Sequence, residues 1–240
     1  MTDRRTRTLV YRMTAPEQAP IEIPLVLDAE TLLLQRPEGP LPEWARLENR
    51  QCSHCPLQAD AHPFCPLAAA LAGPIEECSA CASAERVALE VETPERRICA
   101  EVSPQRALSS LFGLIMPTSG CPHLRHFRPM ARFHLPLATA EETVYRATGM
   151  YLLAQYFARK RGGKFDFELM GLDAIYRLAH KTNREFARRI RHASEDSAAI
   201  RALLILDIFT IALPNAIGEM LSGLEPLFAP LAEDVDPGDA

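Results

Sequence analysis

The sequence predicts an α+β protein with a small β-rich N-terminal part, a Cys-rich junction clamped by a metal, and a C-terminal helical bundle. Three observations support this class. Apolar and polar residues alternate over the first 35 positions, cysteines gather between Cys52 and Cys81, and helix-capping signals begin at Ser103. The expected parts are a β-rich part with the Cys-rich segment over 1–102, a helical domain over 103–232, and a disordered acidic tail over 233–240.

Two stretches near the N-terminus have the period of two that β-strands require. The apolar residues that share a face at this period are Leu9, Tyr11 and Met13, followed by Ile21, Ile23, Leu25 and Leu27. A turn is expected at Asp28-Ala-Glu. Residues 86–91 and 97–102 bracket a TPER stretch, and this pattern predicts a β-hairpin.

Capping residues mark the helices that follow. Ser103 before Pro104 is an N-cap with proline at the first helical position, and Pro117 is expected to end this helix. Thr139 and Glu142 fit a capping box that opens a helix running to about Arg161. The apolar stripe of the next helix consists of Leu172, Ile175, Tyr176, Ala179, Phe186 and Ile190, with Asn183 inside it.

Residues 198–213 form the longest apolar run and predict a helix at the centre of the bundle. A buried carboxylate needs a partner, so Asp207 in this run is expected to be paired, with an arginine as the favoured partner. The run is too short and too charged to cross a membrane. The polar N-terminus has no signal-peptide pattern, and we expect a cytoplasmic protein that does not bind membranes.

Composition narrows the classes of function. The chain has 240 residues and a net charge of −5, which argues against a surface built to bind nucleic acid. It contains no Ser-His-Asp arrangement, Gly-rich phosphate loop or H-E-x-x-H motif that would support a hydrolase or a nucleotide-dependent enzyme. Seven cysteines and seven histidines are the unusual feature. In a reducing compartment, clustered cysteines bind metals or carry redox chemistry more often than they form disulfides.

Three sets of four residues could hold a metal tetrahedrally. They are a local set (Cys52, Cys55, His62, Cys65), a paired-knuckle set (Cys52, Cys55, Cys78, Cys81) and a long-range set (Cys52, Cys55, Cys65, Cys121). The long-range set is favoured because Cys55, Cys65 and Cys121 each precede a proline. Pro66 begins a stretch of residues that favour a helix, so Cys65 is expected at the N-cap of that helix. A helix N-terminus stabilises the thiolate form of cysteine.

Four thiolates in a closed site suit a structural zinc ion. An iron–sulfur cluster can use the same ligands and is the alternative, although the spacing differs from the standard ferredoxin patterns. Cys99 lies in a predicted strand and is interpreted as a buried core thiol.

Several short motifs together resemble an uncharacterised bacterial protein family with no assigned activity. They are Trp44-Ala-Arg-Leu-Glu, Gln51-Cys-Ser-His-Cys-Pro-Leu, His62-Pro-Phe-Cys-Pro, Thr118-Ser-Gly-Cys-Pro, Arg132-Phe-His-Leu-Pro and Met150-Tyr-Leu-Leu-Ala-Gln-Tyr. The resemblance covers nearly the whole chain. It implies a pattern of Cys52, Cys55, Cys65 and Cys121, with the other cysteines outside it, and it supplies no reaction.

No acidic residue occurs between Val102 and Ala140, a stretch rich in arginine and histidine. We expect residues 120–136 to line a site for an anionic small molecule or an acidic protein surface. The candidate ligand-binding residues are Arg125, Arg128, Arg132 and His134. The alternative is a solvated face with capping arginines. A second basic face is expected to be solvated and consists of Arg177, Lys181, Arg184, Arg188, Arg189 and Arg191.

Three functions are therefore carried forward. The first is a cytoplasmic zinc-binding protein whose metal is structural and which acts as a ligand sensor or interaction module. The second is an iron–sulfur or metal-dependent redox protein. The third is a zinc enzyme with an open coordination position that uses His123 or His134.

Overall fold

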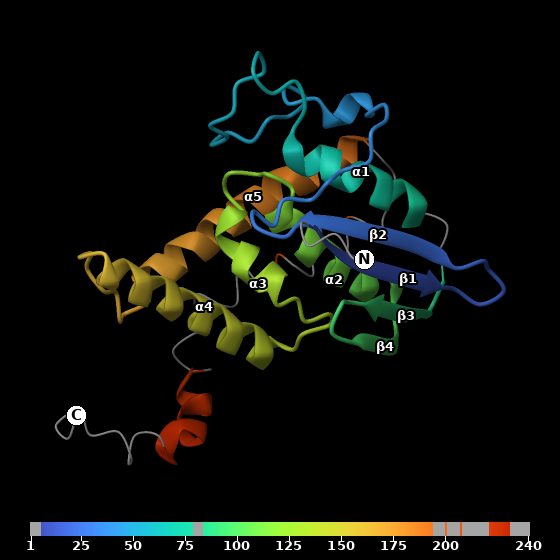
Figure 1. Ribbon diagram of the computed structural model, residues 1–240. Helices are drawn as coiled ribbons and strands as arrows, with labels where there is room; N and C mark the ends of the chain where they lie inside the picture. The colour runs from blue at the N-terminus through green and yellow to red at the C-terminus, as the bar shows by residue number, and fades with distance from the viewer. Residues whose placement is uncertain (1–5, 79–83, 194–199, 201–206, 208–220, 231–240) are drawn as a thin grey trace.

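The computed structural model describes residues 6–78, 84–193, 200, 207 and 221–230 (Figure 1). It confirms the α+β class, with a four-stranded antiparallel sheet followed by helices. Cys81, most of the predicted central helix over 198–213 and the acidic tail over 233–240 lie outside the described residues. No helix in the described ranges is long and apolar enough to cross a membrane.

The sheet has the strand order β2-β1-β3-β4. Its strands are β1 (Thr6–Thr14), β2 (Ile21–Asp28), β3 (Val87–Glu92) and β4 (Arg97–Val102). Tyr11 in β1 pairs with Ile23 on one side and Val91 on the other. Pro24 is tolerated because β2 is an edge strand, where a missing backbone N–H leaves no ladder bond unmade.

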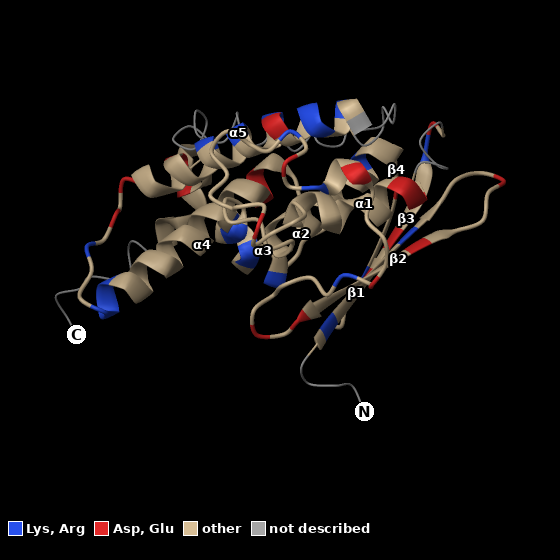
Figure 2. Ribbon diagram, turned by 90° about the horizontal axis from the view of Figure 1, so that it is seen from above, with Lys and Arg blue, Asp and Glu red and all other residues tan. Residues whose placement is uncertain are grey.

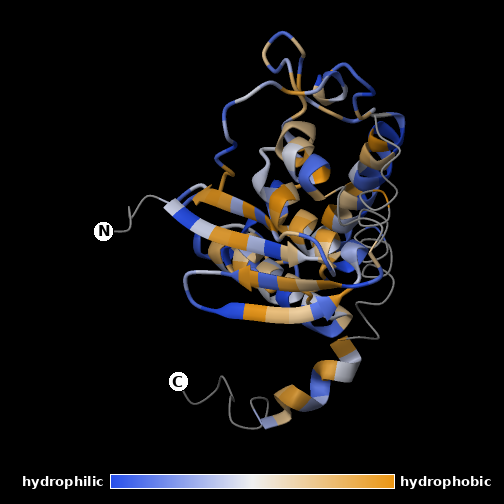
Figure 3. Cartoon of the chain, turned by 90° about the vertical axis from the view of Figure 1, so that its right-hand side faces the viewer, coloured by the Kyte–Doolittle hydropathy of each residue, from blue (hydrophilic) through white to orange (hydrophobic). Residues whose placement is uncertain are grey.

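The two faces of the sheet differ as the alternating pattern predicts. Leu9, Tyr11 and Met13 are fully buried on the inner face. On the outer face Arg12 donates to Glu22 at 2.7 Å and to Glu90 at 2.8 Å. Figure 2 shows this mixture of acidic and basic residues on the strands, and Figure 3 shows the alternation of hydropathy along them.

The helical elements follow the predicted order. They are η1 (Glu43–Ala45), α1 (Pro66–Cys78), α2 (Pro104–Thr118), η3 (Arg125–Phe127), α3 (Arg128–Arg132), α4 (Ala140–Lys160), α5 (Met170–Ala193) and η4 (Glu225–Phe228). Ser103 caps α2 by accepting from the Arg106 N–H, and both bonds of the capping box at Thr139 are present. Pro117 lies inside the last turn of α2, which ends one residue later than predicted.

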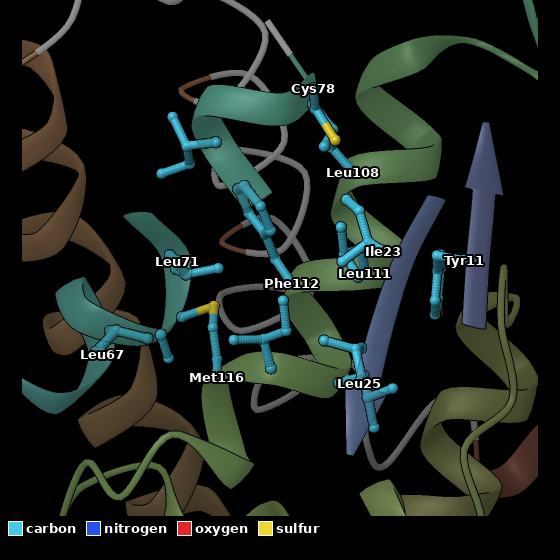
Figure 4. Packing of buried hydrophobic residues seen from close by; sticks show 14 of the residues in the cluster. Tyr11, Ile23, Leu25, Leu67, Leu71, Cys78, Leu108, Leu111, Phe112 and Met116 are labelled. Carbon is cyan, nitrogen blue, oxygen red and sulfur yellow. The ribbon is translucent and has the colours of Figure 1, made fainter. Parts of the chain in front are cut away.

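One hydrophobic cluster joins the sheet to the helices. Leu9 and Ile23 from the strands, Leu71 from α1, and Phe112 from α2 belong to this cluster, as do Phe186 and Ile190 of α5. Figure 4 shows side chains from α1, α2 and the strands packed in this core. A second, smaller cluster lies between α4 and α5. The sheet and α2 therefore share one core, although the predicted domain boundary falls between residues 102 and 103. The division of the chain into these two parts stays a prediction.

Asp207 is buried and paired, as expected. The contact seen is with a histidine, whereas an arginine was the favoured partner: His180 Nδ1 of α5 lies 2.7 Å from Asp207 Oδ1. The contact links α5 to the one described residue near the middle of the predicted central helix.

Candidate metal centre and ligand cavity

Three separate segments carry the four cysteines of the long-range set. A tight turn closed by the Cys55 N–H and the Cys52 carbonyl, at 2.9 Å, brings the first two together. Cys65 precedes α1 as predicted, and its carbonyl accepts the Ala69 N–H at 2.9 Å. Cys121 follows α2, and the backbone N–H groups of His123 and Leu124 donate to its sulfur.

These four cysteines line one small cavity, which we call the thiol cavity. Its volume is about 20 Å³, and Leu67 of α1 and Phe186 of α5 complete its walls. Cys52, Cys55, Cys65 and Cys121 are all free thiols. Within the described part of the chain, no three His, Cys, Asp or Glu side chains form a ready metal-binding group.

The other residues of the competing ligand sets lie elsewhere. His62 is exposed and is not among the described residues of the thiol cavity. Cys78 is 1% exposed and packs in the hydrophobic core. The prediction of a buried Cys99 is wrong, because this side chain lies on the exposed outer side of β4 and its sulfur faces Glu90. Cys81 lies outside the described residues.

Polar contacts tie the Cys52–Cys55 turn to α5. Glu185 accepts the Ser53 backbone N–H at 2.6 Å and the Ser53 hydroxyl at 2.8 Å. The His54 ring lies 3.1 Å from the Thr182 hydroxyl and stacks on His123 with ring centroids 4.4 Å apart. In known metal sites, hydrogen bonds from residues around the ligands orient those ligands in the same way.

The surroundings of the thiol cavity disfavour deprotonation of its cysteines unless a cation is present. Burial, with a smaller contribution from the neighbouring Cys65, raises the pKa of Cys52 to about 12. Burial likewise raises the pKa of Cys121 to about 11. Arg189 acts in the opposite direction, because its guanidinium lowers the pKa of Cys52. Metal binding at this site would therefore be accompanied by proton release.

Arg189 corrects the prediction that the whole basic face of α5 is solvated. The side chain is 1% exposed and lines the thiol cavity. Its guanidinium donates to the carbonyls of Trp44 at 3.2 Å, Arg46 at 2.7 Å and Leu47 at 3.1 Å. Its buried Nε has no hydrogen-bond partner among the residues that the structure describes. Arg188, the preceding residue, is exposed as predicted.

A larger cavity of about 180 Å³, which we call the helix cavity, lies between α2, α3, α4 and α5. The predicted ligand-binding segment 120–136 contributes Leu124, Phe127, Met130 and Leu135 to its lining, together with His134. Arg125, Arg128 and Arg132 are not among its described lining residues.

The three arginines instead make local contacts or face solvent. Arg125 is exposed. Arg128 Nε donates to the Pro117 carbonyl at 3.2 Å, and the Arg132 guanidinium lies over the Phe133 ring. The structure therefore brings only His134 of the four predicted residues to a cavity, and the ligand-binding role of the other three stays a prediction.

His134 ends a hydrogen-bond chain that begins on α2. Its Nε2 lies 2.5 Å from the Tyr11 hydroxyl, which lies 3.0 Å from the Ser110 hydroxyl. Burial, with a smaller contribution from the nearby Arg146, lowers the pKa of His134 to about 3. The imidazole is therefore neutral at physiological pH, and one hydrogen bond joins its Nε2 to the Tyr11 hydroxyl.

We predict that His134 makes stability fall as the pH is lowered. Its pKa is about 3 in the folded chain and near 6.5 in the unfolded chain, so the unfolded state binds one more proton between these values. His134→Gln keeps an acceptor for Tyr11 without titrating. Between pH 6.5 and 4.5 the wild type should lose up to about 1.4 kcal/mol per pH unit more than this variant. Urea unfolding across this range measures the difference, and parallel curves would contradict the assignment.

The fold is α+β, and four free cysteines from three segments line one small cavity within it. The chain belongs to the family described as Domain of unknown function (DUF6901), whose model matches residues 9–229. This confirms the resemblance to an uncharacterised family without an assigned activity. No curated protein and no solved structure matches the chain.

Proposed function

We propose that this chain is a cytoplasmic zinc-binding protein whose metal is structural and whose helical part senses a small ligand. One observation carries the proposal. Cys52, Cys55, Cys65 and Cys121 come from three segments of the chain, yet all four line one cavity. Four cysteines around one small space are the ligand set of a structural zinc site.

The surroundings of the thiol cavity support zinc over an iron–sulfur cluster. A volume of about 20 Å³ suits a species the size of one ion or one water. A cluster of several iron and sulfur atoms would need more room. Arg189 offers a buried cation beside the sulfurs, which would offset part of the negative charge of four thiolates.

A metal at this position would fix the segment that lines the helix cavity. Cys121 is three residues before Leu124, the first described residue of that segment to reach the cavity. The hydrogen bond from His123 Nε2 to the His54 carbonyl, at 2.9 Å, adds a second tie to the Cys52–Cys55 turn. A rigid support of this kind improves the placement of ligand-contacting groups.

The alternative of a zinc enzyme with an open coordination position has less support. His134 lines the helix cavity, so it does not face the four sulfurs. His123 does line the thiol cavity, but its Nε2 is bonded to the His54 carbonyl.

Purification under anaerobic conditions followed by elemental analysis and an absorption spectrum tests the proposal. We expect one zinc per chain and no visible absorption. A brown protein with iron and inorganic sulfide would favour the redox alternative. A fully folded protein that contains no metal after purification in zinc-supplemented buffer would contradict the proposal.

A further inference from the structure

The helix cavity combines an apolar body with a cationic edge. Its apolar walls include Met116, Leu124, Phe127, Met130, Leu135 and Leu137. Arg106 of α2 and Arg146 of α4 also line it, whereas its described lining contains no Asp or Glu. Of the helices that line this cavity, α2 lies beside the sheet, and α4 starts near the sheet and runs away from it (Figure 1).

Arg146 holds its positive charge at this edge without a carboxylate partner among the described residues. Its Nη2 donates to the carbonyls of Met130 at 2.9 Å and Phe133 at 2.8 Å. Glu142, one helical turn away, is engaged in the capping box, where its carboxylate accepts the Thr139 N–H. Burial lowers the pKa of Arg146, which means that the site places a charge where solvent stabilises it poorly. An anion in the cavity would relieve this cost.

One further polar atom at the cavity has no hydrogen-bond partner among the described residues. Asn183 is 3% exposed, lines the cavity, and its Oδ1 has no hydrogen-bond partner. His134 also lines the cavity, where its Nε2 lies 2.5 Å from the Tyr11 hydroxyl. Buried polar groups in native proteins are nearly always bonded, so an unpaired amide oxygen at a cavity wall points to a bound molecule.

We propose that the helix cavity binds a small organic carboxylate with an apolar body of one ring or a short hydrocarbon chain. The carboxylate would lie toward Arg146, and the apolar body toward Phe127 and Met130. An apolar cavity of about 150 Å³ holds benzene, so about 180 Å³ accommodates one ring with a carboxylate. This inference rests on the sensing role proposed above and gives it a ligand class.

Benzoate and hexanoate serve as probes, with benzyl alcohol and 1-hexanol as neutral counterparts of similar size. Calorimetry and thermal unfolding of the full chain, with zinc content measured in the same preparation, are the readouts. At least one acid should bind and raise the melting temperature, about 10-fold or more tightly than its alcohol. Arg146→Gln should weaken the acid by about 10-fold or more, while the matched control Arg132→Gln should leave binding unchanged.

Absence of binding by both acids, equal binding of acid and alcohol, or equal binding by wild type and Arg146→Gln would each overturn the proposal. These outcomes are independent of the zinc content, which tests the metal centre separately.

Discussion

Cys121→Ser is expected to release the metal and to lower the melting temperature by about 8–16 °C. Structural zinc sites contribute about 10–16 kcal/mol of apparent binding energy to folding, and losing about 4 kcal/mol of it corresponds to this shift for a chain of this length. The effect is large because a metal bound to Cys121 would tie the end of α2 to the Cys52–Cys55 turn and to Cys65, which line the same cavity. Differential scanning calorimetry with elemental analysis measures both changes.

Cys99→Ser is the matched control for this variant, because Cys99 is exposed on the sheet. We expect its zinc content and melting temperature to equal those of wild type. Cys78 is unsuitable as a control, since it is 1% exposed in the hydrophobic core. If Cys121→Ser kept its full complement of zinc, the set of Cys52, Cys55, Cys65 and Cys121 would be wrong.

The parts of the fold that the sequence predicts well depend on local signals. The alternation of Leu9, Tyr11 and Met13 places them on the buried face of β1. The N-caps Ser103 and Thr139 make the bonds that their spacing predicts, because both partners lie within one helical turn. In such cases the sequence contains the complete interaction.

Properties that depend on distant partners were predicted less well. Cys99 has the sequence neighbourhood of a core strand residue, but β4 is an edge strand and this position lies on its exposed side. His134 could be identified as a titratable group, whereas its partner Tyr11 lies 123 positions away. The unpaired Asn183 did carry a signal, since a polar residue interrupted the apolar stripe of α5.

The approach of the four cysteines is the non-local feature that the sequence did indicate. The signal was chemical: three Cys-Pro steps in segments separated by up to 66 positions, from Cys55 to Cys121. Proline at the first position of α1 leaves Cys65 at the start of the helix, where its backbone is available to bond Ala45. Zinc itself remains a proposal that the metal analysis decides.

The second large effect is expected at Arg189, whose replacement by methionine should destabilise the fold by about 3–5 kcal/mol. Three backbone carbonyls between Trp44 and Leu47 accept from this one guanidinium. Methionine fills similar volume but donates nothing, so buried carbonyls lose their partners, at about 1–3 kcal/mol for each one that water cannot reach. Urea unfolding of Arg189→Met against the exposed control Arg188→Met measures the cost, and equal stabilities would contradict it.

Arg189→Lys separates the charge of this side chain from its geometry. Lysine retains a positive charge near Cys52, but its single ammonium cannot reproduce the planar fork that reaches three carbonyls. If the fork is what matters, Arg189→Lys should lose most of the stability lost by Arg189→Met while keeping its zinc. If instead the positive charge beside the thiols dominates, lysine should restore both stability and zinc content. The first result is expected, because the three hydrogen bonds join the 44–47 segment before the Cys-rich turn directly to α5.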